Sequence, residues 1–555
     1  MQIRTLSLVL TALLTALPGL AATDDDPPSE AKASPTLHGE LALSLADAVA
    51  MGIENNLDVE ISRYQPLLAE EDVQISEGAY DPELFSEFGY DSDETLNVNP
   101  LLGLGRVRTR TVGGAAGLQG QLPMLGGSYR LNYIGTSNDY STTFFALSPE
   151  HRAALEASVV LPVMRNLFWS QPWTQVKLSA VDYDISLEEF RRRLMDTIGG
   201  TPLPQGGDIG GIVQAYWNLV AREEDLRVAQ KSLETAEALL EQAQAQYDVG
   251  VVSRVEVVEA EAGVADRDFN LIGAQNQYRN AQDRLIDGVL GPNLTPDSRL
   301  EIRPTDRPER IHQLLGTLVV PDVEQAAQLA FESRPELAIA RKAIEQNEIT
   351  LQFAKNQRLP QLDLEATMGY GGLSGTCNPK QVPPLGVDCT TVTNPSLGGF
   401  SSANNFLNPG ENSYSWGARG IFSIPLGNRQ ASGRASQADL SLRRSHTQLR
   451  RLEQDVVLQV RRAVRNLQSS AEGIEAAERR RLASEEQLRA ETIRLEHGES
   501  TPFDVLLREE DLVSAESQKI FALQAYRDSL TALERAQGTI LRNHNIVVEE
   551  ALAMR

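Results

Sequence analysis

The chain contains two copies of one sequence pattern, and this duplication constrains the fold more than any other feature. Residues 46–90 align without gaps with residues 324–368, at an offset of 278. A second ungapped match pairs residues 211–286 with residues 459–534, at an offset of 248. Because both matches keep the same order along the chain, the sequence predicts two copies of a single structural unit.

The alignments and the distribution of proline set the expected boundaries. The first repeat is expected at 43–290 and the second at 321–541, with an N-terminal linker at 23–42 and a C-terminal tail at 542–555. The intervening segment, 291–320, is rich in proline and is predicted to link the repeats. In each repeat a helix (43–78 and 321–358) is followed by a β segment (79–165 and 359–427) and a helical hairpin (170–290 and 430–541).

The N-terminus has the pattern of a secretory signal peptide, predicted at residues 1–22. Arg4 precedes the apolar run 6–17, and small residues follow at 19–22. No later segment approaches the roughly 18–20 apolar residues that a membrane-spanning helix needs. If the mature protein crosses a membrane, we therefore expect it to do so by strands.

Three stretches in the β segments alternate between apolar and polar residues, at 155–163, 361–370 and 414–424. This period of two predicts strands with one apolar face, as in the wall of a transmembrane barrel. A soluble sheet with one solvated face would give the same pattern, and the signal peptide favours the barrel. Residues 106–112 and 128–134 also alternate. They predict an additional hairpin, either in the barrel or folded above it.

The long helices carry apolar side chains at intervals of seven residues, which predicts left-handed coiled-coil packing. No proline interrupts residues 435–497, so this helix would form a rod of roughly 95 Å. The corresponding helix of the first copy is interrupted at 199–211, where about ten residues are inserted. The seven-residue repeat runs through Leu219, Leu226, Leu233, Leu240 and Tyr247, and through Leu506, Val513 and Ile520.

The charge balance excludes one class of partner. The chain has 76 Asp and Glu against 51 Lys and Arg, for a net charge of −25. Binding to nucleic acid depends on basic patches that release counterions, so we expect no nucleic-acid partner. An acidic surface keeps the protein soluble or favours cations.

The two cysteines, Cys377 and Cys389, bracket a loop rich in proline and glycine. In an exported protein this spacing favours a disulfide that closes the loop. A free pair and a metal site are the alternatives, and a metal site would need further ligands nearby.

The sequence has no recognisable catalytic or cofactor-binding motif. The six histidines show no close metal-ligand spacing, and there is no nucleophile elbow, phosphate-binding loop or dinucleotide fingerprint. We therefore expect no enzyme activity, no cofactor and no metal.

The stretch 494–506 reads instead as a turn between two helices. Gly498 suits the left-handed position just past a helix end. Thr501 fits an N-cap, and Asp504 stands three residues later, as in a capping box. The first copy repeats this spacing at Gly250, Ser253 and Glu256.

In its order of features the chain resembles the TolC family of outer-membrane efflux proteins. The resemblance covers nearly all of the mature chain, and its most specific segments are 43–63, 323–341 and 494–506. It implies an α+β membrane protein built from a duplicated helix–β–long helical hairpin unit. Three protomers would share one outer-membrane β-barrel, which continues into an α-helical coiled-coil tunnel in the periplasm.

The resemblance also implies roles for the two turns, which would form the periplasmic tip of the tunnel. Asp504 aligns with a carboxylate that rings the family's entrance, and Glu256 and Glu259 are the matching candidates in the first copy. The family's second entrance aspartate is Leu507 here, so a ring would be built differently. Capping and an entrance role are compatible. The surface that docks a periplasmic adaptor would comprise Gly250, Val251, Val252, Ser253, Gly498, Glu499, Ser500 and Thr501.

The function implied is an exit duct of a tripartite efflux pump or a type I secretion system, gated at its tip. Its partners would be two further copies of the chain, a periplasmic adaptor, an inner-membrane transporter and outer-membrane lipid. Its location would be the outer membrane of a Gram-negative-type bacterium. The alternatives are a periplasmic coiled-coil scaffold that forms no channel and a periplasmic enzyme with a helical domain.

Overall fold

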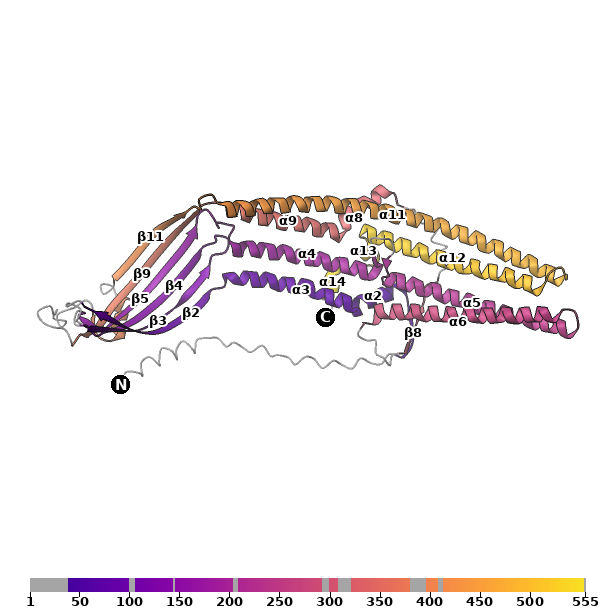
Figure 1. The fold of residues 1–555 in the computed structure, drawn as a ribbon, viewed down its shortest axis with the longest axis horizontal. Coiled ribbons are helices and arrows are strands. Elements are labelled where there is room, and N and C mark those ends of the chain that lie inside the picture. The colour runs from indigo at the N-terminus through magenta and orange to yellow at the C-terminus, as the bar shows by residue number, and fades with distance from the viewer. Residues whose placement is uncertain are drawn as a thin grey trace.

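In the computed structural model the chain is long and narrow (Figure 1). A β-sheet lies at one end, helices run along the length, and two helical turns lie at the other end. The structure describes residues 38–98, 105–142, 145–202, 208–291, 299–307, 321–379, 396–407 and 413–553. The predicted signal peptide and Cys389 lie outside the described residues, whereas Cys377 ends a strand.

The described elements follow the duplicated order. The first part of the chain forms β1 (His38–Leu43), α2 (Leu45–Asn55), α3 (Leu57–Glu77), η1 (Gly78–Tyr80), β2 (Glu83–Asn97), β3 (Gly105–Gln121), β4 (Ser128–Tyr140), β5 (Leu147–Pro162), α4 (Gln171–Gly199), β6 (Thr201–Pro202), β7 (Asp208–Ile209), α5 (Ile212–Asp248) and α6 (Arg254–Leu290). The second part forms β8 (Arg299–Pro304), α8 (Val323–Ser333), α9 (Pro335–Asn356), β9 (Gln361–Cys377), β10 (Ser396–Leu397), α10 (Phe400–Ala403), η4 (Asn404–Leu407), β11 (Ser413–Ser423), α11 (Arg429–Glu496), α12 (Pro502–Gln537), α13 (Ile540–Asn543) and α14 (Val548–Ala553).

Each of the two repeat-initial helices is divided by a break, where the sequence pattern suggested one helix. In the first repeat Asn56 adopts an extended conformation between α2 and α3. Its side chain accepts hydrogen bonds from the backbone N–H groups of Asp58 and Val59, so it ends one helix and caps the next. In the second repeat the break falls at Arg334, because Pro335 opens α9 and disfavours a helical residue before it.

The additional hairpin joins the main sheet. The strands follow the order β2–β3–β4–β5–β9–β11, and every neighbouring pair in this order is antiparallel. The short β10 adds a parallel pairing to β9. The strands β3 and β4 therefore pair with their neighbours along most of their length. Within the described chain, β2 forms one edge of the sheet, and β11 with the short β10 forms the other.

The main sheet has one apolar and one polar face, as adjacent rows across its six long strands show. One row is apolar and contains Leu84, Leu118, Leu131, Ala157, Met368 and Trp416. The next row projects to the opposite face and contains Glu83, Gln119, Arg130, Ser158, Thr367 and Gly417. The alternation seen in the sequence thus extends across the whole sheet.

The main hydrophobic core lies where the two repeats meet, midway along the helices. It includes the fully buried side chains of Phe190, Tyr216 and Ile540. The Tyr216 hydroxyl donates to the Asp306 carboxylate at 2.8 Å, which fixes the end of β8 against α5. Among the described residues, no helix combines the length and apolar character needed to cross a membrane.

The insertion at 199–211 forms a small hairpin beside this core. The strands β6 and β7 pair with each other, and α5 begins directly after them. Gly211 lies against the backbone at Gly200, and a Cβ atom there would come within 2.3 Å of the Gly200 nitrogen. The inserted residues thus leave the helical rod and return to it through a contact that requires glycine.

Candidate functional site at the helical tips

The turns that join α5 to α6 and α11 to α12 have the same backbone structure. Gly250 and Gly498 adopt φ values of +79° and +74°. The N–H of Val251 donates to the carbonyl of Gln246, five residues earlier, and the N–H of Glu499 bonds a carbonyl at the same spacing. Both helices therefore end in a Schellman motif with glycine in the left-handed position. Apart from the two adjacent residues, no atom lies within 4 Å of where a Cβ would stand on either glycine.

The helices that follow both begin with a capping box. The Asp504 carboxylate accepts from the Thr501 hydroxyl at 2.7 Å, and the Asp504 N–H donates to that hydroxyl at 3.2 Å. Glu256 accepts from the hydroxyl and the N–H of Ser253, at 3.3 and 3.4 Å. Glu259, three residues after Glu256 on the same helix, is exposed. Two of the three predicted entrance carboxylates are therefore engaged at helix N-termini, where the dipole stabilises their charge.

Exposed apolar side chains surround these turns, and of these residues the sequence had indicated only Val251. Val249, Val251 and Val255 are 75%, 72% and 64% exposed on the first hairpin, and Phe503 is 51% exposed on the second. We call these four residues the apolar tip patch. Their position in the sequence could have indicated this surface, because residues in a loop or in the first turn of a helix far from any core are ordinarily polar. Exposed apolar groups gathered at one end of a molecule mark an interaction surface.

The two hairpins are joined near the tip by buried polar groups. From α6, the Arg267 guanidinium donates to the backbone carbonyl of Leu506 on α12 at 3.1 Å. A Cβ atom on Gly263 would lie 3.0 Å from the Leu506 side chain, so α6 and α12 are close here. Glu509 is only 4% exposed, and burial raises its pKa to about 7 despite the charge of Arg267. None of these contacts follows from the pattern of one helix alone.

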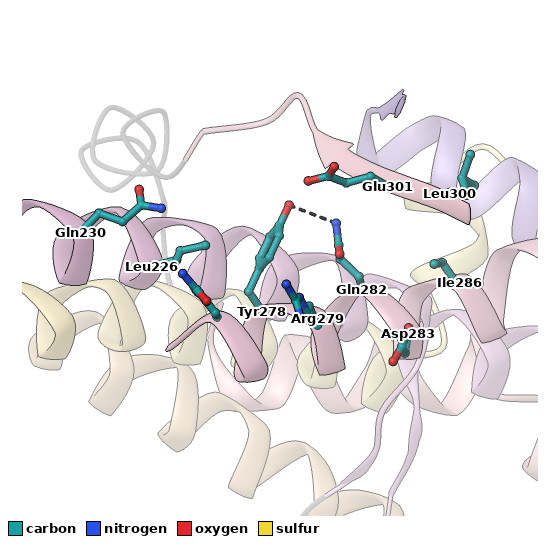
Figure 2. Close-up of a pocket in the computed structure, with 10 residues that line it drawn as sticks. Leu226, Gln230, Tyr278, Arg279, Gln282, Asp283, Ile286, Leu300 and Glu301 are labelled. Atoms are coloured by element: carbon teal, nitrogen blue, oxygen red, sulfur yellow. Dashed lines mark hydrogen bonds between the residues drawn. The ribbon is translucent and has the colours of Figure 1, made fainter. Parts of the chain in front are cut away.

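A groove lies further up the first hairpin, between α5, α6 and β8 (Figure 2). It has a volume of about 1,220 Å³. The Gln282 amide nitrogen donates to the Tyr278 hydroxyl at 3.1 Å and to the carbonyl of Ile302 at 3.2 Å. Burial and the nearby acidic groups of Glu223 and Glu301 raise the pKa of Tyr278 to about 12, so its hydroxyl stays protonated. The groove offers hydrogen bonds and no activated nucleophile.

Within the described part of the chain, no three His, Cys, Asp or Glu side chains are arranged to hold a metal ion. His497 is the C-cap residue of α11, and its Nδ1 lies 2.7 Å from the carbonyl oxygen of Ile493.

Comparison with known proteins gives one family. The sequence model of the family described as "Outer membrane efflux protein" matches residues 209–288 and 326–539. "Outer membrane protein TolC" of Escherichia coli (strain K12) is 23% identical over 342 residues, which is 61% of this chain and 63% of that protein. The match thus spans less than two thirds of this relative's length.

Solved structures share the fold over most of their length. The Campylobacter jejuni CmeC outer membrane channel superposes with a TM-score of 0.56 at 13% identity, covering 89% of this chain and 86% of that one. The open state of the Neisseria gonorrhoeae MtrE outer membrane channel superposes with a TM-score of 0.55 at 15% identity, covering 90% of this chain and 89% of that one. The Vibrio cholerae outer membrane protein VceC superposes with a TM-score of 0.55 at 15% identity, covering 89% of this chain and 96% of that one. These likenesses establish a common α+β fold.

Proposed function

The chain belongs to the outer membrane efflux protein family, and from this we propose that it is a channel through the outer membrane of a Gram-negative-type bacterium. It would serve as the exit duct of a tripartite efflux pump or a type I secretion system. It would be a passive conduit with no chemical step, driven by an inner-membrane transporter.

The observation that best supports this proposal is the two-faced sheet at one end of the helices. An open sheet edge cannot sit in lipid, because its backbone groups have no partner there. With six antiparallel strands in a row, the edge strands β2 and β11 run in opposite directions. The β11 edge of one copy can therefore pair antiparallel with the β2 edge of the next.

Three copies joined in this way would close a barrel of eighteen strands, because each contributes six. The apolar face would contact lipid and the polar face would line a water-filled lumen, as in other large barrels. The helices that continue from the sheet would enclose the tunnel in the periplasm.

The tip is proposed to be both the gate and the docking surface. Asp504, Glu256 and Glu259 from three copies would converge at the entrance, attract cations and repel anions. A periplasmic adaptor would dock on the two glycine turns and cover the apolar tip patch. Adaptor binding would favour a splayed arrangement of the hairpins over a closed one.

The docking proposal is tested by placing a large side chain at each of the two turn glycines. A side chain at Gly250 or Gly498 would meet no neighbouring group, and the left-handed backbone there costs a non-glycine residue only about 1–2 kcal/mol. The variant Gly250→Trp with Gly498→Trp should therefore leave folded trimers in the membrane and abolish export. The matched control is Asn at both positions, since Asn tolerates the left-handed conformation and is small; it should retain export. Normal export by the Trp double variant would refute docking at the turns.

The channel itself is tested in planar bilayers. Purified trimers should give cation-selective conductance, and heat-modifiable trimers should appear in outer-membrane fractions. A protein found only in soluble periplasmic fractions would instead be the coiled-coil scaffold.

A further inference from the structure

Three arginines stand in a column on β3, at its end farthest from the helices (Figure 1). Arg106, Arg108 and Arg110 occupy alternate positions, so all three project to the same face of the sheet. Across the ladder on β2 they face Leu96, Glu94 and Ser92, respectively.

The face that carries this arginine column is the apolar one. Val112, the next residue of β3 on that face, is opposite Tyr90, and Leu118 is opposite Leu84. The stretch of β3 from Val112 to Gly120 has no charged residue on this face. It is about as long as the roughly 9–11 residues with which a strand crosses a bilayer. The arginine column therefore begins where the predicted hydrocarbon layer ends, on the side away from the periplasmic helices.

The column is exposed and only partly neutralised. The side chains of Arg106 and Arg108 are 76% and 47% exposed, and each lies 3.2 Å from the Glu94 carboxylate. One carboxylate thus serves two guanidinium groups, each of which carries five N–H donors. On the other side, Asp139 is opposite Arg110 on β4 and accepts from the Ser148 hydroxyl at 3.0 Å. Most guanidinium donors therefore remain available.

We propose that the arginine column binds the phosphate groups of anionic lipid headgroups in the outer leaflet of the membrane. Guanidinium groups bind phosphate through paired, charge-assisted hydrogen bonds. A lipid fits better than a free anion because the column continues directly into the apolar face, and Leu96 is 82% exposed among the arginines. A phosphorylated lipid would place its chains on that face and its phosphates on the column. The proposal rests on the proposed function, which puts this face in the membrane.

The test uses the full-length trimer in phosphatidylcholine nanodiscs. Three probes are added: lipid A with both phosphates, lipid A with its phosphates removed, and inorganic phosphate. Native mass spectrometry counts the lipid retained, and melting temperature gives an independent measure. The test variant is R106Q/R108Q/R110Q. The matched control, R130Q/R419Q, removes arginines from the polar face of the same sheet.

The wild type and the control should bind phosphorylated lipid A about tenfold to a hundredfold more tightly than the triple variant. Phosphate-free lipid A should bind all three proteins alike, and millimolar inorganic phosphate should not displace the lipid. Equal retention by the triple variant would overturn the proposal, and so would full displacement by inorganic phosphate. If the triple variant fails to fold, the same comparison is made with R110Q alone, for which a smaller loss of affinity for phosphorylated lipid A is expected.

Conductance separates this inference from the proposed function. If the wild type conducts but does not distinguish the two forms of lipid A, only the arginine column is refuted. If the wild type inserts into no membrane and gives no conductance, the proposed function fails.

Discussion

The guanidinium of Arg267 on α6 reaches the backbone carbonyl of Leu506 on α12, across a distance of 3.1 Å. Leu506 lies only two residues beyond Asp504, the predicted entrance carboxylate, in the first turns of the same helix. One hydrogen bond thus ties the tip of the second hairpin to the first. Because Arg267 is 8% exposed, few water molecules compete for this bond.

Loss of this hydrogen bond should loosen the proposed gate. We expect Arg267→Gln to increase the conductance of trimers in planar bilayers and to lower the free energy of unfolding by about 2–3 kcal/mol. The control is Arg508→Gln, which removes only a partly exposed pair with Asp511 and should cost no more than about 1 kcal/mol. Equal conductance in the two variants would show that Arg267 does not hold the tip closed.

The buried carboxyl of Glu509 predicts a pH dependence of stability. Burial raises its pKa from 4.5 to about 7, so between these values the folded chain holds a proton that the unfolded chain has released. Stability from this group is therefore greatest below pH 4.5 and is lost as pH rises toward 7. At pH 8 we expect Glu509→Gln to be more stable than the wild type, by up to about 3 kcal/mol.

The measurement is denaturant unfolding of both proteins at pH 5 and pH 8. The difference in the free energy of unfolding between the two proteins should be large at pH 8 and small at pH 5. An unchanged difference would mean that Glu509 is charged at both pH values. The groups that face this carboxyl are the hydroxyls of Ser232 and Thr235 on α5 and the guanidinium of Arg267 on α6.

Local patterns in the sequence predicted the strands better than their pairing. The alternation at 106–112 and 128–134 indicated two extra strands, and the structure forms β3 and β4 there. Their place in the sheet depends on backbone pairing with β2 and β5, which no local pattern encodes. The sequence also understated β3, because the run from Gly113 to Gly117 has low strand propensity. Pairing on both sides holds that run extended.

The turns were predictable because glycine and capping residues act over a few positions. Gly498 and the Thr501–Asp504 pair occupy the positions that their spacing indicated. The contact between Arg267 and Leu506 was not predictable, since it joins different repeats. The arginine column lay within a stretch recognised as a strand. Its position on the apolar face beside Val112 became clear only from the register between β2 and β3.

A buried ion cluster joins the repeats and predicts a large loss of stability. Arg535 on α12 lies 2.6 Å from the Asp196 carboxylate on α4 and 2.9 Å from that of Glu336 on α9. Burial alone would raise the pKa of Glu336, but the Arg535 and Arg334 guanidinium groups outweigh it and lower the pKa to about 2. Arg535→Met would leave the Asp196 carboxylate without its partner and would leave Glu336 paired with Arg334 alone. We expect the free energy of unfolding to fall by about 3–5 kcal/mol.

A compensating variant is the control for this cluster. Neutralising the Asp196 carboxylate in the same chain, as R535M/D196N, should recover part of the stability because the uncompensated charge is gone, while Glu336 keeps its pair with Arg334. Denaturant unfolding at pH 7 compares the three proteins. If the double variant is less stable than Arg535→Met alone, charge does not explain the loss.

Adjacent residues on the edge strand β11 test which face of the sheet contacts lipid. Trp416 is 76% exposed on the apolar face opposite Met368, and Ser415 projects to the polar face. Arginine on the lipid side of a barrel costs about 2–4 kcal/mol near the middle of the bilayer and far less in the lumen. We therefore expect Trp416→Arg to reduce heat-modifiable trimers in outer-membrane fractions sharply, and Ser415→Arg to leave them near the wild-type amount. The opposite result would mean that the polar face is turned toward lipid, and an equal result would mean that neither face is.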